Sequence, residues 1–208
     1  MPRNAPLSPA AVAVELVPAD YSKPLVLHQV FGRNAPVEVD LGCGDGLFLA
    51  TMADENPKRD FLGIEQTIGR VRSACRKIAR RNLTNARVLR AEIAETVRHL
   101  LAPASVEVFH LMFPDPWPKR RHHSRRLVTE EFLRSITRTL TADGTLRIVT
   151  DHADYFDDIT RALSHVSHLA LDPKGEAHLP ATSTFEEKFR GSGAEIYRLW
   201  LRKVSEVR

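Results

Sequence analysis

A glycine-rich segment with an acid at its start is the first part of this sequence that could perform chemistry. The apolar run 37–41 contains Asp40 and is followed by Gly42, Gly44 and Gly46. Glycines there let the backbone turn tightly and approach a ligand at the start of a helix. The spacing is G-x-G-x-G, whereas dinucleotide sites typically show G-x-G-x-x-G. An acid inside the strand end disfavours a pyrophosphate and suits a cationic group.

Two more acids follow the next two predicted strands. Glu65 closes the apolar segment 61–64, and Glu92 follows a strand predicted near residues 87–89. An acid in the position of Glu65 can accept hydrogen bonds from both hydroxyls of a ribose, and Glu92 could meet an adenine. A ribose, an adenine and a positive centre together describe S-adenosylmethionine, which we predict as the cofactor. The competing interpretation is an ordinary glycine turn with acids at helix starts.

A proline-rich segment with a basic tail is the second candidate site. Residues 113–119 read F-P-D-P-W-P-K, and the closely spaced prolines predict a rigid, extended turn that holds Asp115 and Trp117 at the rim. The run 119–126 contains five lysines and arginines and no acid. It is either a site for a polyanion or a solvated charged face, and the formal net charge of +4 does not decide between them.

Strands that alternate with helices must position these residues. Residues 67–81 predict a helix that buries Val71, Ala74, Cys75 and Ile78. Further helices are expected at 47–52, 93–101, from 130 and at 153–165, and further strands at 106–113, 145–149 and 195–202, with a turn at 143–144. This order predicts an α/β fold with a doubly wound, mostly parallel seven-stranded sheet, whose ligands lie at the carboxyl ends of the strands. We expect residues 1–34 to form an arm and 35–208 a single domain.

Composition sets the remaining limits. The chain has 208 residues, of which 43% are hydrophobic and 27% charged, a balance that excludes a disordered chain or a coiled coil. No apolar stretch is long enough for a membrane helix or a signal peptide, so we expect a cytoplasmic protein. The two cysteines, Cys43 and Cys75, form no disulfide framework, and no metal-ligand spacing is evident, so no metal cofactor is expected.

Taken together, these motifs resemble the bacterial tRNA (guanine-N7)-methyltransferase family, whose members have the class I S-adenosylmethionine-dependent fold. The resemblance covers about residues 37–202. It is carried by residues 113–117 (F-P-D-P-W) with the basic run, by Thr150 and Asp151, and by residues 183–189 (S-T-F-E-E-K-F).

The resemblance implies roles for individual residues. Asp40, Glu65, Glu92 and Asp115 match acidic cofactor-binding positions beside the loop of Gly42 and Gly44, and Asp115 also matches the active-site residue. Positions that contact tRNA are matched by Lys119, Asp151, Ser183, Thr184, Phe185 and Glu186, and the segment of Arg121, Arg125 and Arg126 matches one assigned to RNA interaction. Asp40, Glu92 and Ser183 stand where the family usually has Glu, Asp and Thr, and each keeps the functional group.

The implied chemistry needs little from the protein beyond alignment. N7 of guanine has an in-plane lone pair and no proton, so its methylation requires no general base. The protein must align the reacting atoms and provide a suitable field. We hypothesise that Asp115 bridges cofactor and base and that Asp151 accepts hydrogen bonds from guanine N1 and N2. For RNA, phosphates supply affinity and an exposed base supplies specificity. Phosphate candidates are Lys119, Arg121, Arg125 and Arg126, and Trp117 or Phe185 could stack on the base.

Other function classes stay open at this stage. A methyltransferase for another RNA, a protein or a small molecule would share everything up to Glu92. A noncatalytic RNA-binding module would not explain the acids at Asp40, Glu65 and Asp115. An NAD-dependent oxidoreductase fits the glycine spacing poorly. We expect tRNA as partner, no membrane, no obligatory protein subunit, and a monomer or homodimer.

Overall fold

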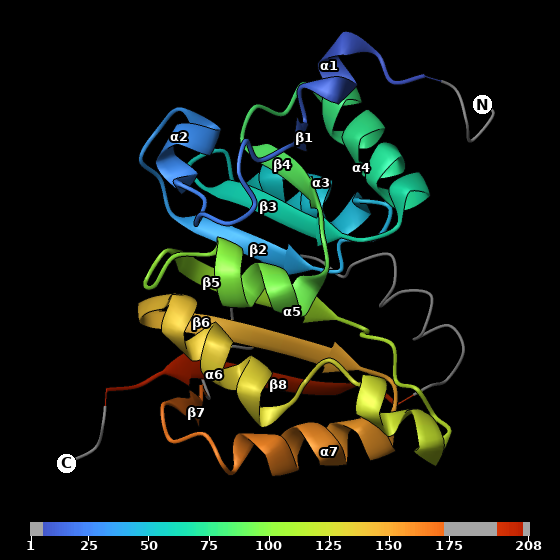
Figure 1. The fold of residues 1–208 in the computed structure, drawn as a ribbon, viewed down its shortest axis with the longest axis vertical. Helices are drawn as coiled ribbons and strands as arrows, with labels where there is room; N and C mark the ends of the chain where they lie inside the picture. Colours follow the sequence, from blue (N-terminus) through green and yellow to red (C-terminus); the bar gives the residue numbers. More distant parts are fainter. Residues whose placement is uncertain (1–5, 173–194, 206–208) are drawn as a thin grey trace. The chain divides into compact units, whose positions relative to one another are not determined.

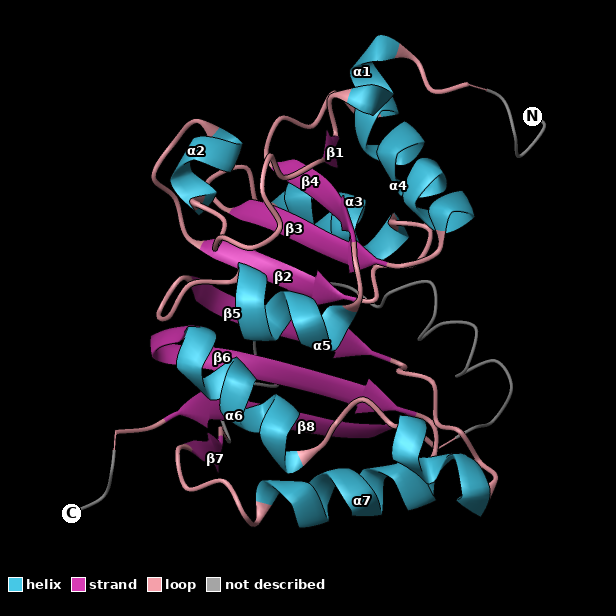
Figure 2. Cartoon of the chain, in the orientation of Figure 1, coloured by secondary structure: helices cyan, strands magenta, loops and turns pink. Residues whose placement is uncertain are grey.

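The structure, a computed structural model, describes residues 6–172 and 195–205. They fall into two compact units, Met1–Ala102 and Pro103–Arg208. Each unit contains strands of a β-sheet with helices packed on them (Figures 1 and 2). None of the helices in residues 6–172 and 195–205 has the length and hydropathy of a membrane-spanning segment.

The first unit is built on four parallel strands in the order β1-β4-β3-β2. Along the chain, its elements are α1 (Pro9–Val12), β1 (Glu15–Leu16), α2 (Leu27–Phe31), β2 (Val37–Leu41), α3 (Leu47–Glu55), β3 (Asp60–Glu65), α4 (Ile68–Arg80), β4 (Ala86–Arg90), α5 (Ile93–Glu95) and a π-helix, η1 (Thr96–Leu100).

Helices cover both faces of this first sheet. The predicted apolar stripe of α4, namely Val71, Ala74, Cys75 and Ile78, is fully buried, and it packs with residues of α1, α3, β3 and β4 in one cluster. Figure 1 shows α5 on the opposite face of the sheet from α3 and α4. Both β2 and β3 are buried along their whole length, as expected for parallel strands covered on both faces.

The second unit contains strands in the order β5-β6-β8-β7, of which β5 and β6 are parallel and the other neighbours antiparallel. Its elements are β5 (Val106–Met112), a 3-10 helix, η2 (Arg120–Arg125), α6 (Glu130–Thr139), β6 (Leu140–Thr150), α7 (Ala153–Leu163), β7 (Leu169–Leu171) and β8 (Tyr197–Lys203). Thr129 caps α6, and its side chain accepts a hydrogen bond from the backbone N–H of Phe132.

Three expectations differ from the structure in detail. The segment predicted as an arm contains two short helices and β1, and β7 lies outside every predicted strand range, so the described residues contain eight strands where a seven-stranded sheet was predicted. The helix predicted at 93–101 is divided into α5 and η1. The turn predicted at 143–144 lies within β6 as an irregularity, with Asp143 at a φ of 60°. The prediction that residues 35–208 form a single domain stays a prediction.

Candidate active site

The glycine loop follows β2 and leads into α3. Gly42, Gly44 and Gly46 all have positive φ angles, of 85°, 56° and 76°. A Cβ atom on Gly46 would lie 2.4 Å from Cβ of Ala74, so this glycine is needed for α3 to pack against α4. At Gly44 the nearest atom to such a Cβ would be 3.9 Å away, so only the backbone angle requires glycine there. The side of Gly44 on which a Cβ would lie is thus open, as the approach of a ligand from that side requires.

Asp40 is an unusual carboxylate, because it is buried in β2 just before this loop. Only 4% of the residue is exposed, and its Oδ2 has no hydrogen-bond partner among the described residues. Burial, reinforced by the negative charge of Glu65, raises the pKa of Asp40 to about 7. A buried carboxylate without a partner is costly. The arrangement fits a cationic ligand group, such as the ammonium of S-adenosylmethionine, that would supply the missing charge.

Glu65, at the end of β3, is held beside the glycine loop by hydrogen bonds. Its Oε1 accepts a hydrogen bond of 2.7 Å from the N–H of Thr67, and its Oε2 accepts one of 3.2 Å from the N–H of Gly44. The guanidinium of Arg70 lies 3.9 Å from Oε2. The carboxylate is therefore held in place with lone pairs left to accept hydrogen bonds from a ribose.

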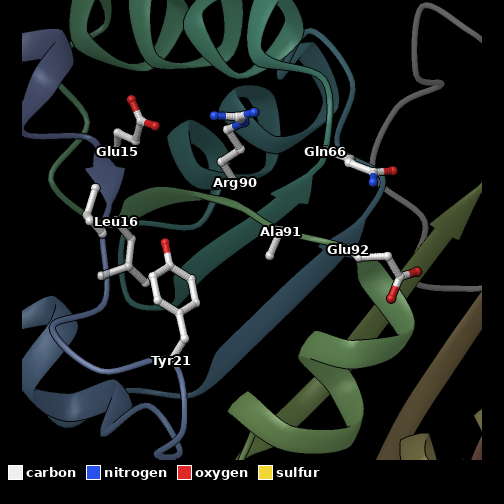
Figure 3. A pocket seen from close by; sticks show the side chains of 8 residues that line it. Glu15, Leu16, Tyr21, Gln66, Arg90, Ala91 and Glu92 are labelled. Atoms are coloured by element: carbon white, nitrogen blue, oxygen red, sulfur yellow. The ribbon is translucent and has the colours of Figure 1, made fainter.

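Glu92 follows β4 and caps α5. Its two carboxylate oxygens accept hydrogen bonds from the N–H groups of Ala94 at 3.1 Å and Glu95 at 2.7 Å. The side chain is exposed, and it borders a cavity of about 440 Å³. Figure 3 shows this cavity, which is also lined by Glu15, Leu16, Val17, Tyr21, Gln66, Arg90 and Ala91. Tyr21 and Arg90 could not be predicted as lining residues from the sequence, because neither belongs to a motif with recognisable spacing.

In the second unit, the proline-rich loop that follows β5 is strained at both ends. Phe113 and Trp117 have φ angles of 52° and 45°, which bulky residues rarely adopt. Asp115 lies between them and is exposed. Such backbone strain persists only where surrounding contacts impose it, and it is concentrated at functional sites. The predicted rigid presentation of Asp115 thus agrees with the observed conformation of the loop.

Contacts with the basic run surround Trp117. The guanidinium carbon of Arg125 lies 5.0 Å from the centre of the Trp117 ring, and the ring of His122 meets it edge-on at 5.9 Å. Arg125 therefore covers one face of the indole, so a base could stack only on the other face. Lys119, Arg121 and Arg125 are exposed, as phosphate contacts require.

Arg126 departs from its predicted role. Its side chain is only 3% exposed and is ion-paired with Asp154 and Asp158 of α7. The structure therefore favours an internal role for Arg126 over the predicted phosphate contact. The sequence could have hinted at this, because Asp154 and Asp158 are spaced i, i+4 and so share one face of a helix.

The remaining predicted residues are only partly described. Asp151 is half-buried between the end of β6 and the start of α7. The buried neighbour Thr150 accepts a hydrogen bond of 3.3 Å from the N–H of His152, which caps α7. Ser183, Thr184, Phe185 and Glu186 lie outside the described residues. Cys43 and Cys75 are buried with raised thiol pKa values, caused chiefly by desolvation, which makes them poor nucleophiles.

Comparison with known sequences gives a consistent picture. The family described as "Putative methyltransferase" matches residues 34–199. A tRNA (guanine-N(7)-)-methyltransferase of Alkalilimnicola ehrlichii is 36% identical over 93% of this chain and 82% of its own length. A protein of the same name from Leifsonia xyli is 40% identical over 86% of this chain and 82% of its own length.

Solved structures with the same fold are also methyltransferases. The 16S rRNA methyltransferase KamB matches with a TM-score of 0.58 and 15% identity, over 86% of this chain and 93% of that one. The aminoglycoside resistance methyltransferase NpmB1 matches with a TM-score of 0.57 and 19% identity, over 86% and 92%. These likenesses confirm the predicted α/β methyltransferase fold, and at such identities they show the fold alone.

Proposed function

This chain belongs to the tRNA (guanine-N(7)-)-methyltransferase family, and from that membership we propose that it methylates N7 of a guanosine in the variable loop of tRNA. The strongest support is the sequence identity of 36%, over 93% of the chain, with a relative of that name. The methyl donor of this family is S-adenosylmethionine, and the buried, partnerless Oδ2 of Asp40 beside the glycine loop supports a site for it here.

The first unit supplies the proposed cofactor-binding residues other than Asp115. Asp40 would face the ammonium group, Glu65 would accept hydrogen bonds from the ribose, and Glu92 would border the adenine. Gly42 and Gly44 place no side chains of their own in the loop, and the Cβ side of Gly44 is open for close approach. When bound, S-adenosylmethionine supplies an electrophilic methyl group on a sulfonium. The task of these residues is to fix its position and exclude alternative orientations.

The second unit supplies the substrate-binding residues. Asp115 is our proposed catalytic residue, and Asp151 is proposed to accept hydrogen bonds from the guanine N1 and N2 donors. Exposed Lys119, Arg121 and Arg125 are proposed to bind phosphates of the tRNA. Ser183, Thr184, Phe185 and Glu186 stay proposed tRNA contacts by family resemblance alone. No residue has to remove a proton, because N7 carries none.

The test is direct identification of the product. The purified chain is incubated with methyl-labelled S-adenosylmethionine and unmodified tRNA transcripts, and the tRNA is then digested to nucleosides. We expect labelled 7-methylguanosine, and none from a matched transcript in which adenosine replaces the variable-loop guanosines. Label in another nucleoside would refute the proposed substrate position, and tRNA binding without label would favour a noncatalytic module.

A further inference from the structure

The buried guanidinium of Arg126 is held by contacts from several segments of the second unit. Its Nε donates a hydrogen bond of 2.8 Å to the carbonyl oxygen of Pro116. Nη2 donates one of 2.6 Å to Oδ2 of Asp154, and Nη1 donates to Oδ2 of Asp158. The guanidinium carbon also lies 4.9 Å from the ring centre of Tyr155. These contacts use most of the N–H donors of the guanidinium and cover one of its faces.

Tyr155 is itself tightly placed. It is fully buried, and its hydroxyl oxygen accepts a hydrogen bond of 3.1 Å from the N–H of Val128. The ring under Arg126 is thus anchored to the segment that leads into α6. Desolvation is the largest single influence on Arg126 and lowers its pKa, but the hydrogen bonds and charges of Asp154 and Asp158 together outweigh it and raise the pKa. Arg126 stays charged and has little surface left for a phosphate.

The groups joined by Arg126 belong to two segments that the proposed function uses. Pro116 directly follows Asp115 in the strained loop, and Asp154 comes three residues after Asp151, in the first turn of α7. One side chain therefore ties the loop that carries the proposed catalytic residue to the helix that follows the proposed guanine contact. The positive φ angles of Phe113 and Trp117 require such an external restraint.

We propose that Arg126 is a positioning residue for methyl transfer, which fixes the Asp115 loop against α7. The inference rests on the proposed function and assigns Arg126 a role other than RNA binding. Its neighbour Arg125 has the opposite character, because it is exposed and packs on Trp117. The last two arginines of the basic run thus have separate tasks, one inside the protein and one at its surface.

The test compares Arg126→Lys with Arg134→Lys. Arg134 is an exposed arginine of the same unit that pairs with Glu130 at 2.5 Å and lies outside the proposed site. Lysine keeps the charge but cannot reproduce the planar fork of donors. We expect Arg126→Lys to lower the single-turnover rate about 100-fold at saturating tRNA and cofactor, as for a misplaced reacting group. The tRNA Kd and its salt dependence should stay within about twofold.

Two results would overturn this inference. A weaker tRNA Kd with a flatter salt dependence and a normal rate would identify Arg126 as a phosphate ligand. A lower unfolding midpoint with a normal rate per folded molecule would show a role in stability alone. If Arg126→Lys does not fold, Asp158→Asn decides, because it removes the charge that faces Arg126 while keeping the side-chain shape. Asp158 also pairs with Arg161, so Arg161→Gln is the control for that second contact. A normal rate in Asp158→Asn would equally overturn the inference. Wild-type protein that produces no 7-methylguanosine would instead refute the proposed function.

Discussion

The glycine loop after β2 and the proline-rich loop after β5 both require left-handed backbone, but they achieve it by opposite means. The first places glycines at all three positions with positive φ, where the conformation costs little. The second places Phe113 and Trp117 there, at a cost on the order of 1 kcal/mol or more for each residue. Contacts from Arg125 and Arg126 accompany the second loop.

This difference corresponds to two kinds of function. Glycines place no side chain of their own between the backbone and a ligand, so the first loop suits the binding of a cofactor at close range. A loop held by prolines, strained residues and a buried arginine suits the fixed presentation of one side chain, here Asp115. In the first loop, glycines avoid backbone strain and leave space for a ligand. In the second loop, backbone strain accompanies the fixed position of Asp115.

Removal of the presented side chain should have the largest effect. We expect Asp115→Ala to reduce the rate of 7-methylguanosine formation at least about 10³-fold, equivalent to about 4 kcal/mol, because an electrostatic contact in the transition state is lost. The Kd for tRNA, measured by filter binding, should change little. If rate and binding fall equally, the proline-rich loop would be a binding element and the contrast between the loops would fail.

Asp40, beside the glycine loop, should give the next largest effect, which is a dependence of the unfolding free energy on pH. The pKa of Asp40 is raised to about 7 from an ordinary value of 3.8, so the folded protein holds a proton that the unfolded chain releases. The unfolding free energy of the wild type should therefore fall relative to Asp40→Asn as pH rises from about 4 to about 7, by up to about 4 kcal/mol.

Urea unfolding of both proteins across this pH range measures that difference. Above pH 7 we expect Asp40→Asn to be more stable than the wild type and to bind S-adenosylmethionine more weakly in calorimetry. Parallel curves of unfolding free energy against pH would show that Asp40 is ionised in the folded protein without cost. A ligand bound beside the glycine loop would then have no energetic penalty to relieve.

Addition of a single methyl group should break the glycine loop. Gly46→Ala places a Cβ 2.4 Å from that of Ala74 at a φ of 76°, so we expect a loss of about 3 kcal/mol in unfolding free energy. Gly69→Ala in α4 is the matched control, because nothing lies within 4 Å of its Cβ, and a gain of about 0.5–1 kcal/mol is expected. Equal stability of the two variants would show that packing imposes no requirement at Gly46.

The smallest expected effect belongs to the exposed partner of the second loop. Arg125→Gln removes a surface charge, so the slope of log Kd for tRNA against log salt should become shallower by about one. Titrations at several salt concentrations measure this slope. An unchanged slope would mean that Arg125 serves only to pack on Trp117, and both final arginines would then act within the protein.

Features that depend on local residue order could be predicted from the sequence. The glycines, the acids at the ends of β2, β3 and β4, and the apolar stripe of α4 could be predicted because each depends on local spacing. The short elements α1 and β1 could not, because four and two residues are too few to show a period.

Arg126 shows the limit most clearly. In the sequence it resembles Arg125, and both belong to one basic run. Its burial depends on Asp154 and Asp158, 28 and 32 residues further along the chain, and on how α7 packs. Composition reports the charge of a side chain, whereas only tertiary structure decides whether that charge meets solvent or a carboxylate.

The two-residue strand β1 has a further consequence, for self-association. β1 pairs with β4 at the outer edge of the first unit's sheet, with Glu15 opposite Val88 and Leu16 opposite Leu89. Without it, β4 would present a longer row of unpaired backbone groups, which is a template for edge-to-edge aggregation. Because β1 covers β4 and is itself only two residues long, the edge that it leaves is a poor template for such pairing.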